Sequence, residues 1–576
     1  DDGITWTNVP ANGTGQNYTP ATELAHGIKY RRKVTDGQGT FGYSNTVQVF
    51  VVTPTTMPNV DAGSNKGKDF WVTFGQIVGY YSSDPSLFMQ LKIVADTTTQ
   101  ITLDFTNDAS ANDVITIPGG VVHTYSFSDA QKAAVYNDAV VTSVSDLSVH
   151  ITSDNPIILY SSYLYPACTD ATEVYPTGSL GKEYYHPGYQ PLSSFYDIGL
   201  MIATQNNTHI YQNTLGGTLL ATLSIGQVFN YCGSIGQDIT GTHFVSDKPL
   251  AYFATTGPNI PYGYGAVDIT YEQLFSVDRW GKNFYVPQTI QGVSRIRVIA
   301  SMNGTVVDGS NFTIPTTTGS QNSPNLNAGQ WVELECSIAD GCYVFANHPI
   351  MVCAYLVGDS YTAVSNDGDP ALSWIAPIEQ KTHNVMVSRF SASSSLINQH
   401  FAMLITETSA KNQTTVSIGG ATPVAVSGVT WYDNAASGLS YCSYTLPDDN
   451  YYIFDNPNGM VVGGYGLGSY ESYYYLAGSA SRILSASLKI NGDYSDEMIG
   501  ETYGECNAIT FECDASETPA SVIWRINGVT QPAYNNLTSW SAALPVDDYV
   551  LEMEAVIGDN TFTQITWFRV RCCVTP

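Results

Sequence analysis

The chain has 576 residues, a formal net charge of −29 at pH 7 and a sequence pI of about 4.4. This length corresponds to about three to five domains at roughly 150 residues each. The acidic balance argues against binding to nucleic acid or to anionic membranes, because both partners attract a basic protein surface. Strand and turn formers such as Val, Thr, Tyr, Asn and Gly are abundant, and the predicted fold class is all-β.

Residues 1–52 carry the pattern of the last strands of a β-sandwich. Strands are predicted in GIKYRRKVTDG and SNTVQVFVV. The segment resembles the tandem Ig-like repeats of large secreted surface proteins of Bacteroidota, in Tyr30, Arg31, Arg32, Val34, Thr35, Tyr43, Ser44, Asn45 and Val47. The resemblance implies the C-terminal part of an Ig-like domain in a longer surface protein. Residues 53–62 are predicted to be an extended linker, stiffened by Pro and Thr.

Helices are expected to be rare. The sequence has no long segment with helical apolar periodicity, and one or two helical turns are predicted at Asp129–Val135. No apolar run reaches the ~18 residues of a membrane helix, so no direct membrane insertion is expected.

One short pattern recurs four times between residues 63 and 490. An apolar strand leads to a corner that contains Asp or Asn and Pro, and a second apolar strand follows. The corner prolines are spaced by 93, 100 and 108 residues and are Pro156, Pro249, Pro349 and Pro457. Asp and Pro favour tight turns, so each pattern predicts a strand, a turn and a returning strand.

Two further patterns keep the same order. A Gly-Lys-aromatic strand starts at Gly67, Gly181 and Gly281, with a weaker form at Gln380, and an apolar hairpin follows each start. Repetition at this length predicts four similar β units that bury a shared core, ending near Gly178, Val277, Pro377 and, with a return strand, at residue 490. The units either close as a propeller-like ring or stack as sandwiches. The return strand at residues 483–490 favours closure.

Residues 63–490 resemble the N-terminal domain of the IgG Fc-binding protein family, a module of mucin-associated animal proteins and of bacterial surface proteins. The resemblance rests on the corners, on the Asn206-Asn207-Thr208 type of hairpin turn and on the start Gly67-Lys68-Asp69-Phe70-Trp71. It implies one large β domain. These residues are structural, so antibody binding does not follow from them.

Residues 491–576 are predicted to form another Ig-like or PKD-like β domain. Five alternating strands are expected, and Trp524 is the natural core anchor. The approach to the late strand resembles the L-x-x-G-x-Y pattern of PKD-like domains, except that Asp547 stands where Gly is expected.

The sequence offers little for catalysis or for metal binding. None of the nine histidines forms HExxH, HxH or a Cys-His pairing, and G-x-S-x-G is absent, so no enzyme is predicted. Asn366, Asp367 and Asp369 surround a Gly and supply the oxygen ligands that calcium prefers, which predicts a calcium site; the alternative is a solvated turn. No other cofactor is expected.

Cysteine and tyrosine supply the remaining candidates. Cys336 and Cys342 flank a turn and are candidates for a disulfide, as are Cys506 and Cys572 in the C-terminal cluster; the alternative is free buried thiols. Tyrosine suits both recognition and strand packing. The candidate ligand-binding tyrosines are Tyr262, Tyr264, Tyr184 and Tyr185.

These features predict a non-enzymatic segment of a large secreted cell-surface protein that binds protein or glycan ligands. The alternative is a structural spacer or a building block of a stalk or filament, whose partners are copies of itself. The predicted location is extracellular, at the cell surface.

Overall fold

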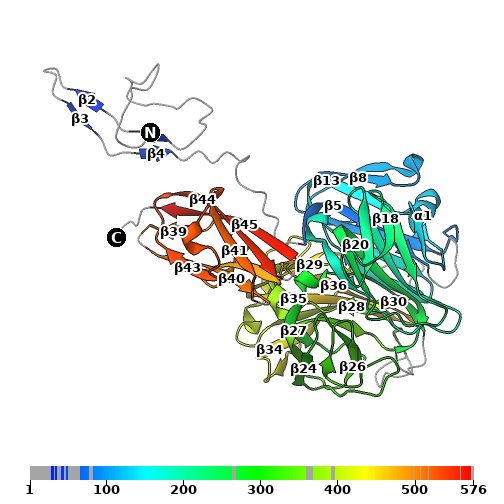
Figure 1. Ribbon diagram of the computed structural model, residues 1–576. Coiled ribbons are helices and arrows are strands. Elements are labelled where there is room, and N and C mark those ends of the chain that lie inside the picture. The colour runs from blue at the N-terminus through cyan, green and yellow to red at the C-terminus, as the bar shows by residue number, and fades with distance from the viewer. Residues whose placement is uncertain are drawn as a thin grey trace. The chain divides into compact units, whose positions relative to one another are not determined.

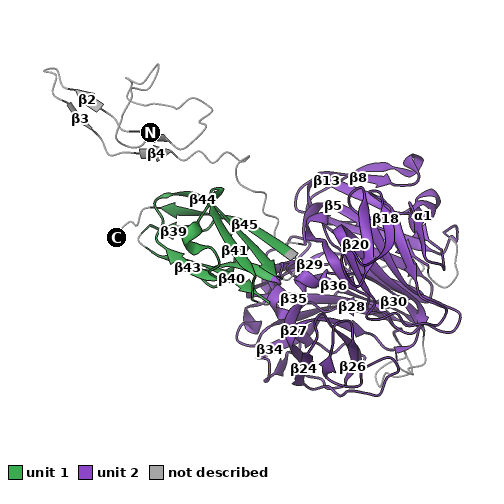
Figure 2. Cartoon of the chain, viewed as in Figure 1, with its two compact units in different colours: residues 1–60, 486–576 green, residues 61–485 purple. Residues whose placement is uncertain are grey.

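The computed structural model is all-β and divides into two compact units, residues 61–485 and residues 486–576 together with 1–60 (Figures 1 and 2). The structure describes residues 65–571 except 77–81, 262–266, 359–366, 391–395, 497, 506, 517 and 558–559, and it describes short strands nearer the N-terminus. Those strands are β1 (Ile28–Tyr30), β2 (Lys33–Thr35), β3 (Phe41–Tyr43) and β4 (Val47–Val49). β1 pairs with β4 and β2 pairs with β3, both antiparallel.

The unit of residues 61–485 repeats one strand plan four times. Each repeat has a first strand, a hairpin, a long strand and a closing strand. The first repeat contains β5 (Gly67–Val72), β6 (Phe74–Gly75), β7 (Phe88–Ala95), β8 (Thr99–Phe105), η1 (Ala109–Ala111), β9 (Asp113–Ile117), β10 (Val121–Ser126), α1 (Asp129–Val135), β11 (Tyr136–Asn137), β12 (Ser143–Ser145), β13 (Val149–Tyr165) and β14 (Cys168–Val174). The second contains η2 (Thr177–Ser179), β15 (Gly181–Tyr185), β16 (Asp197–Ala203), β17 (Thr208–Gln212), β18 (Thr218–Leu223), β19 (Val228–Cys232), β20 (His243–Asn259) and β21 (Asp268–Gln273).

The other two repeats follow the same plan. The third contains η4 (Val277–Arg279), β22 (Gly281–Val286), β23 (Ser294–Ala300), β24 (Thr305–Ser310), β25 (Asn325–Leu326), β26 (Trp331–Cys336), β27 (Cys342–Tyr355) and β28 (Leu372–Trp374). The fourth contains η6 (Ile378–Gln380), β29 (Thr382–Val387), β30 (Ile397–Glu407), η7 (Lys411–Gln413), β31 (Thr415–Ile418), β32 (Val424–Ala425), β33 (Tyr432–Asn434), β34 (Leu439–Thr445), β35 (Tyr452–Gly468) and β36 (Glu471–Gly478).

The short helix predicted at Asp129–Val135 is confirmed as α1. Its start is fixed by a capping box, in which the Ser128 side chain and the Gln131 side chain each bond the other's backbone N–H. Local sequence therefore suffices to place this element.

The four corners are not hairpin turns, and that expectation was wrong. Each corner lies inside one long strand, as Pro156 does inside β13. The first half of β13 pairs with β5 and β8, its second half pairs with β7 and β14, and the register with β5 shifts at the corner. Because Pro cannot donate to a ladder, it is tolerated at such a bend, where one strand passes from one sheet to the next. Each repeat is thus a two-layer sandwich whose longest strand runs through both layers.

The corner side chains hold the neighbouring hairpin. Asp247 accepts bonds from the backbone N–H of His209 at 2.8 Å and from its imidazole Nδ1 at 2.7 Å. In the third repeat, Asn347 Oδ1 accepts from the Val306 N–H at 2.7 Å. The corner therefore ties the bent strand to the turn beside it.

Replacing Asp247 and Pro249 together should destabilise the domain by roughly 1–3 kcal/mol, because bonds to His209 are lost and the unfolded chain gains freedom. Chemical denaturation followed by far-UV circular dichroism measures the change. Asp308→Ala is the control, since Asp308 bonds the amide of its own neighbour. A shift confined to one part of a multi-step transition would show that the repeats unfold separately.

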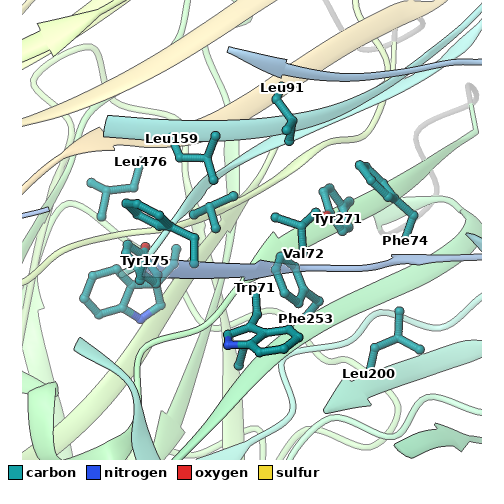
Figure 3. Close-up of a cluster of buried hydrophobic side chains, with 14 of the residues drawn as sticks. Trp71, Val72, Phe74, Leu91, Leu159, Tyr175, Leu200, Phe253, Tyr271 and Leu476 are labelled. Atoms are coloured by element: carbon teal, nitrogen blue, oxygen red, sulfur yellow. The ribbon is translucent and has the colours of Figure 1, made fainter. Parts of the chain in front are cut away.

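The repeats close on one another. β14 contacts both β21 and β36, and β28 contacts the same two strands, so the four closing strands complete a circuit. Figure 3 shows side chains from several repeats in one core, including Leu91, Phe253 and Leu476. The architecture is therefore a closed repeat of sandwiches, and the sheets do not form a clear propeller.

Closure does not use the predicted return strand. β37 (Ala486–Ile490) pairs with β40 (Ile509–Ala515), and so belongs to the C-terminal unit. The chain after β36 instead covers the fourth repeat, where Arg482 N–H donates to Gln380 Oε1 at 2.9 Å.

The Gly-Lys starts have a steric reason. A Cβ at Gly67 would lie 2.2 Å from the Cβ of Pro176, and one at Gly281 would lie 2.4 Å from the Cβ of Pro377. In the first three repeats the first strand is therefore covered by the start of the 3₁₀ turn that opens the following repeat, which leaves no room for a side chain.

The C-terminal unit is a β-sandwich around one core. Its remaining elements are β38 (Asp493–Tyr494), β39 (Thr502–Gly504), β41 (Ser521–Ile526), β42 (Val529–Thr530), η8 (Pro532–Tyr534), β43 (Ser539–Ala542), β44 (Asp547–Ile557) and β45 (Asn560–Arg571). Trp524 is completely buried in that core, as predicted. The Tyr549 hydroxyl donates to the Pro545 carbonyl at 2.9 Å, which is the tyrosine corner of Ig-like domains.

Candidate functional site

The axis of the closed domain is held by one carboxylate. Asp170 lies on β14, and its Oδ2 accepts the backbone N–H of Tyr271 on β21 at 2.9 Å and that of Leu372 on β28 at 3.2 Å. Its Oδ1 accepts from Ala171 on β14 at 2.9 Å and from Tyr474 on β36 at 3.2 Å. One side chain thus joins all four closing strands.

Other acidic side chains lie near Asp170 on β14, β21 and β36 and, in one case, just before β28. All are at most 2% exposed: Glu173, Asp268, Glu272, Asp369 and Glu471. Burial raises the pKa of Asp170 well above its usual range, and its four amide donors oppose that rise. Burial and the neighbouring Asp170 raise the pKa of Glu272 in the same way. The cluster is sealed in the interior, so it serves closure and not contact with a substrate.

Sequence reasoning missed this cluster. Acidic residues in a strand ordinarily face solvent, and three of the four amides that Asp170 binds lie 101, 202 and 304 residues away. A usable signal was the presence of acidic residues within the apolar strands β14, β21 and β36, although β28 has none.

Of the four tyrosines predicted to bind a ligand, the structure describes two. Tyr262 and Tyr264 lie outside the described residues. Tyr184 and Tyr185 are buried; the Tyr184 hydroxyl donates to the Leu250 carbonyl at 2.8 Å, and the Tyr185 ring stacks on His243 at 4.1 Å. We therefore assign Tyr184 and Tyr185 to packing.

The predicted calcium turn is described only in part. Asn366 lies outside the described residues, Asp367 Oδ2 accepts from Gln399 Nε2 at 2.9 Å, and the Asp369 backbone N–H donates to Ser472 Oγ at 2.7 Å. In the part of the chain that the structure describes, no group of three His, Cys, Asp or Glu side chains is placed to hold a metal ion.

The cysteines predicted to form disulfides are also described only in part. Cys506 and Cys572 lie outside the described residues. Cys336, Cys342 and Cys513 are buried thiols.

The arrangement that most resembles a catalytic triad is also buried. His186 Nε2 lies 2.8 Å from Asp197 Oδ1, and His186 Nδ1 lies 2.9 Å from the Tyr252 hydroxyl. All three side chains are at most 1% exposed. This network fixes the second repeat and offers no reacting group to solvent.

A caged arginine joins the second and third repeats. The Arg297 guanidinium carbon lies 4.0 Å from the ring centroid of Tyr189 and 4.1 Å from that of Trp331. The same guanidinium pairs with Asp238 at 2.8 Å and with Glu333 at 3.3 Å. The aromatic cage is thus filled by the chain's own cation.

A buried histidine between the first and fourth repeats gives the domain a pH dependence. Burial lowers the pKa of His400 to about 4, aided by the cations Arg389 and Lys92 and opposed by Asp449, while its Nδ1 lies 2.9 Å from the Tyr473 hydroxyl. Because its pKa is lower in the folded protein, His400 binds a proton more readily after unfolding. Its contribution to the free energy of unfolding is therefore complete above pH ~6.5 and is lost as the pH falls from ~6.5 through ~4.

The free energy of unfolding of the wild type falls between pH 6.5 and pH 4. Replacing His400 with Gln should make this fall smaller by about 2–3 kcal/mol. Urea titrations at several pH values measure it. His348→Gln is the control for the loss of an imidazole elsewhere. An unchanged pH slope in the His400 variant would contradict this origin.

The chain was compared with curated proteins, with solved structures and with protein-family models. Over the described residues, no helix is long and apolar enough to cross a membrane. A search of curated proteins gives no significant match. Solved structures with some similarity include eight N-terminal Ig domains of Down Syndrome Cell Adhesion Molecule, at 9% identity and a TM-score of 0.13, covering 95% of this chain and 75% of that one. Four Ig domains of Dscam1 isoform 7.44 match at 10% identity and a TM-score of 0.13, covering 68% and 98%. At these scores the similarity carries no weight.

The family comparison is stronger. The model of the IgGFc binding protein family matches residues 62–231 and again residues 170–467. Together the two matches run through most of the repeat unit, and their overlap is expected of a chain built from repeats. The chain belongs to the IgGFc binding protein family.

Proposed function

We propose that this chain is a non-enzymatic binding segment of an extracellular cell-surface protein, with protein or glycan ligands. Family membership over residues 62–467 is the observation that carries the proposal. The closed ring supports it, because a rigid scaffold positions surface loops for recognition at low entropic cost. The acidic charge further restricts the partners to those that do not require a basic surface.

Interferometry with the immobilised full chain tests this proposal against mucin, glycans and the Fc fragment of IgG, with the Fab fragment as matched control. We expect saturable binding of at least one of them at micromolar concentration. Absence of binding, together with self-assembly in light scattering, would favour the spacer or filament function instead.

The segment at residues 261–265 remains the predicted contact. Replacing Tyr262 and Tyr264 with Ala should weaken binding about tenfold or more if these rings are central to the interface. Tyr470→Ala is the control, because Tyr470 is 55% exposed on a different turn. Equal binding by both variants would move the contact elsewhere.

A further inference from the structure

Two cysteines of the third repeat meet across a short connection. Cys336 ends β26 and Cys342 begins β27, and both are completely buried. Both side chains pack in the same buried cluster of the third repeat. Cys336 stands opposite Ser294 on β23, and Cys342 stands opposite Val286 on β22. Cys336 therefore lies beside β23, which pairs with the second half of β27, and Cys342 lies in the first half of β27, beside β22.

The connection between the two cysteines is held from several sides. The Tyr285 hydroxyl donates to the Asp340 carbonyl at 2.5 Å, and Asn311 Nδ2 donates to the Gly341 carbonyl at 3.0 Å. Tyr441, from the fourth repeat, donates to the Ala339 carbonyl at 2.6 Å. These bonds fix the turn that joins the two cysteines.

The two thiols differ in character. The hydrogen bond from Cys342 lowers the pKa of Cys336, and donors from Ile338 and Gln288 add to that effect. Burial raises the pKa of Cys342. The thiolate is the form that attacks a disulfide, and the lower pKa favours Cys336 as the first of the pair to react.

We propose that Cys336 and Cys342 form an intramolecular disulfide when the protein meets a small disulfide oxidant such as glutathione disulfide. The Cys336 thiolate attacks one sulfur of glutathione disulfide and releases a glutathione thiolate. The Cys342 thiolate then attacks the Cys336 sulfur of the mixed disulfide and releases the second glutathione. The protein loses two protons and two electrons, and both leave in two molecules of reduced glutathione. Since both sulfurs are buried, exchange takes place during folding or local opening, and the closed domain then shields the bond.

The test folds the full chain in equal concentrations of reduced and oxidised glutathione. Acid quenching, alkylation, digestion and mass spectrometry without reductant then report each cysteine. We expect a cross-linked Cys336–Cys342 peptide in most molecules, while the buried thiols of Cys353 and Cys442 are recovered alkylated. Recovery of both Cys336 and Cys342 as alkylated peptides would overturn the proposal.

Stability provides a second measurement. The oxidised wild type should melt about 2 °C or more above the protein reduced with a phosphine, because the closed loop restricts the unfolded chain. Cys336→Ala should abolish both the cross-link and this difference, whereas Cys442→Ala should retain them. Equal melting temperatures of the oxidised and reduced wild type would overturn the stapling effect without relying on any variant.

Discussion

Replacing Asp170 with alanine is expected to destabilise the whole repeat domain by about 4 kcal/mol or more. Four buried backbone N–H groups, on Ala171, Tyr271, Leu372 and Tyr474, lose their acceptor, and each unsatisfied buried donor costs about 1–3 kcal/mol before relaxation. The loss of a buried carboxyl recovers part of this cost. Calorimetry and guanidinium titration of the full chain measure the change.

Asp170→Asn should lie between the alanine variant and the wild type. An amide retains one acceptor oxygen but turns an NH₂ group toward two amide donors. The surface control is Asp138→Ala, whose carboxylate is exposed and is expected to change stability by less than about 0.5 kcal/mol. An Asp170→Ala protein that unfolds at the wild-type midpoint would refute the role of this carboxylate as the tie between four strands.

The second large effect is expected at Arg297. Changing it to Met keeps an apolar stem between Tyr189 and Trp331, but it removes the cation paired with Asp238 and leaves Glu333 with only the longer, 3.9 Å pair to Arg295. Glu333 is completely buried, so the cost should be about 3–5 kcal/mol. Denaturant titration measures it.

Arg389→Met is the matched control for Arg297. Arg389 pairs with Asp449, whose side chain is 64% exposed, so its loss should cost about 1 kcal/mol or less. Equal effects of the two substitutions would show that the aromatic cage and burial add nothing to the Arg297 pairs.

The sequence predicted the elements whose cause is local. The Ser128 capping box places α1, and the repeated strand plan gives the all-β class and the number of repeats. The corners were mistaken for hairpins because Asp and Pro suit a tight turn and a strand bend equally well. Which of these forms depends on partner strands such as β5 and β7, which precede the corner of β13 by many residues.

The candidate sites were harder to predict for a related reason. Tyr184 was a candidate for recognition, but its side chain is buried by strands that meet only in the folded repeat. Asp170 was missed because three of the four amides that it binds come from the other three repeats. Whether a side chain is buried depends on strands that meet only in the folded domain, so it cannot be read from a short segment of sequence.

The 3₁₀ turn that covers each preceding strand has a consequence for synthesis and export. A chain emerges from the ribosome or from a translocation channel with its N-terminus first, so the strand at Gly67 stays uncovered until Pro176 has emerged. The last of these bonds, from the amide of Tyr474 to Asp170, cannot form until the chain 304 residues beyond Asp170 has emerged. Contacts of such separation form slowly, and the open arc exposes unpaired apolar strands in the meantime. A nascent chain halted before β36 would therefore remain an unclosed, association-prone arc, however well each of its finished sandwiches had folded.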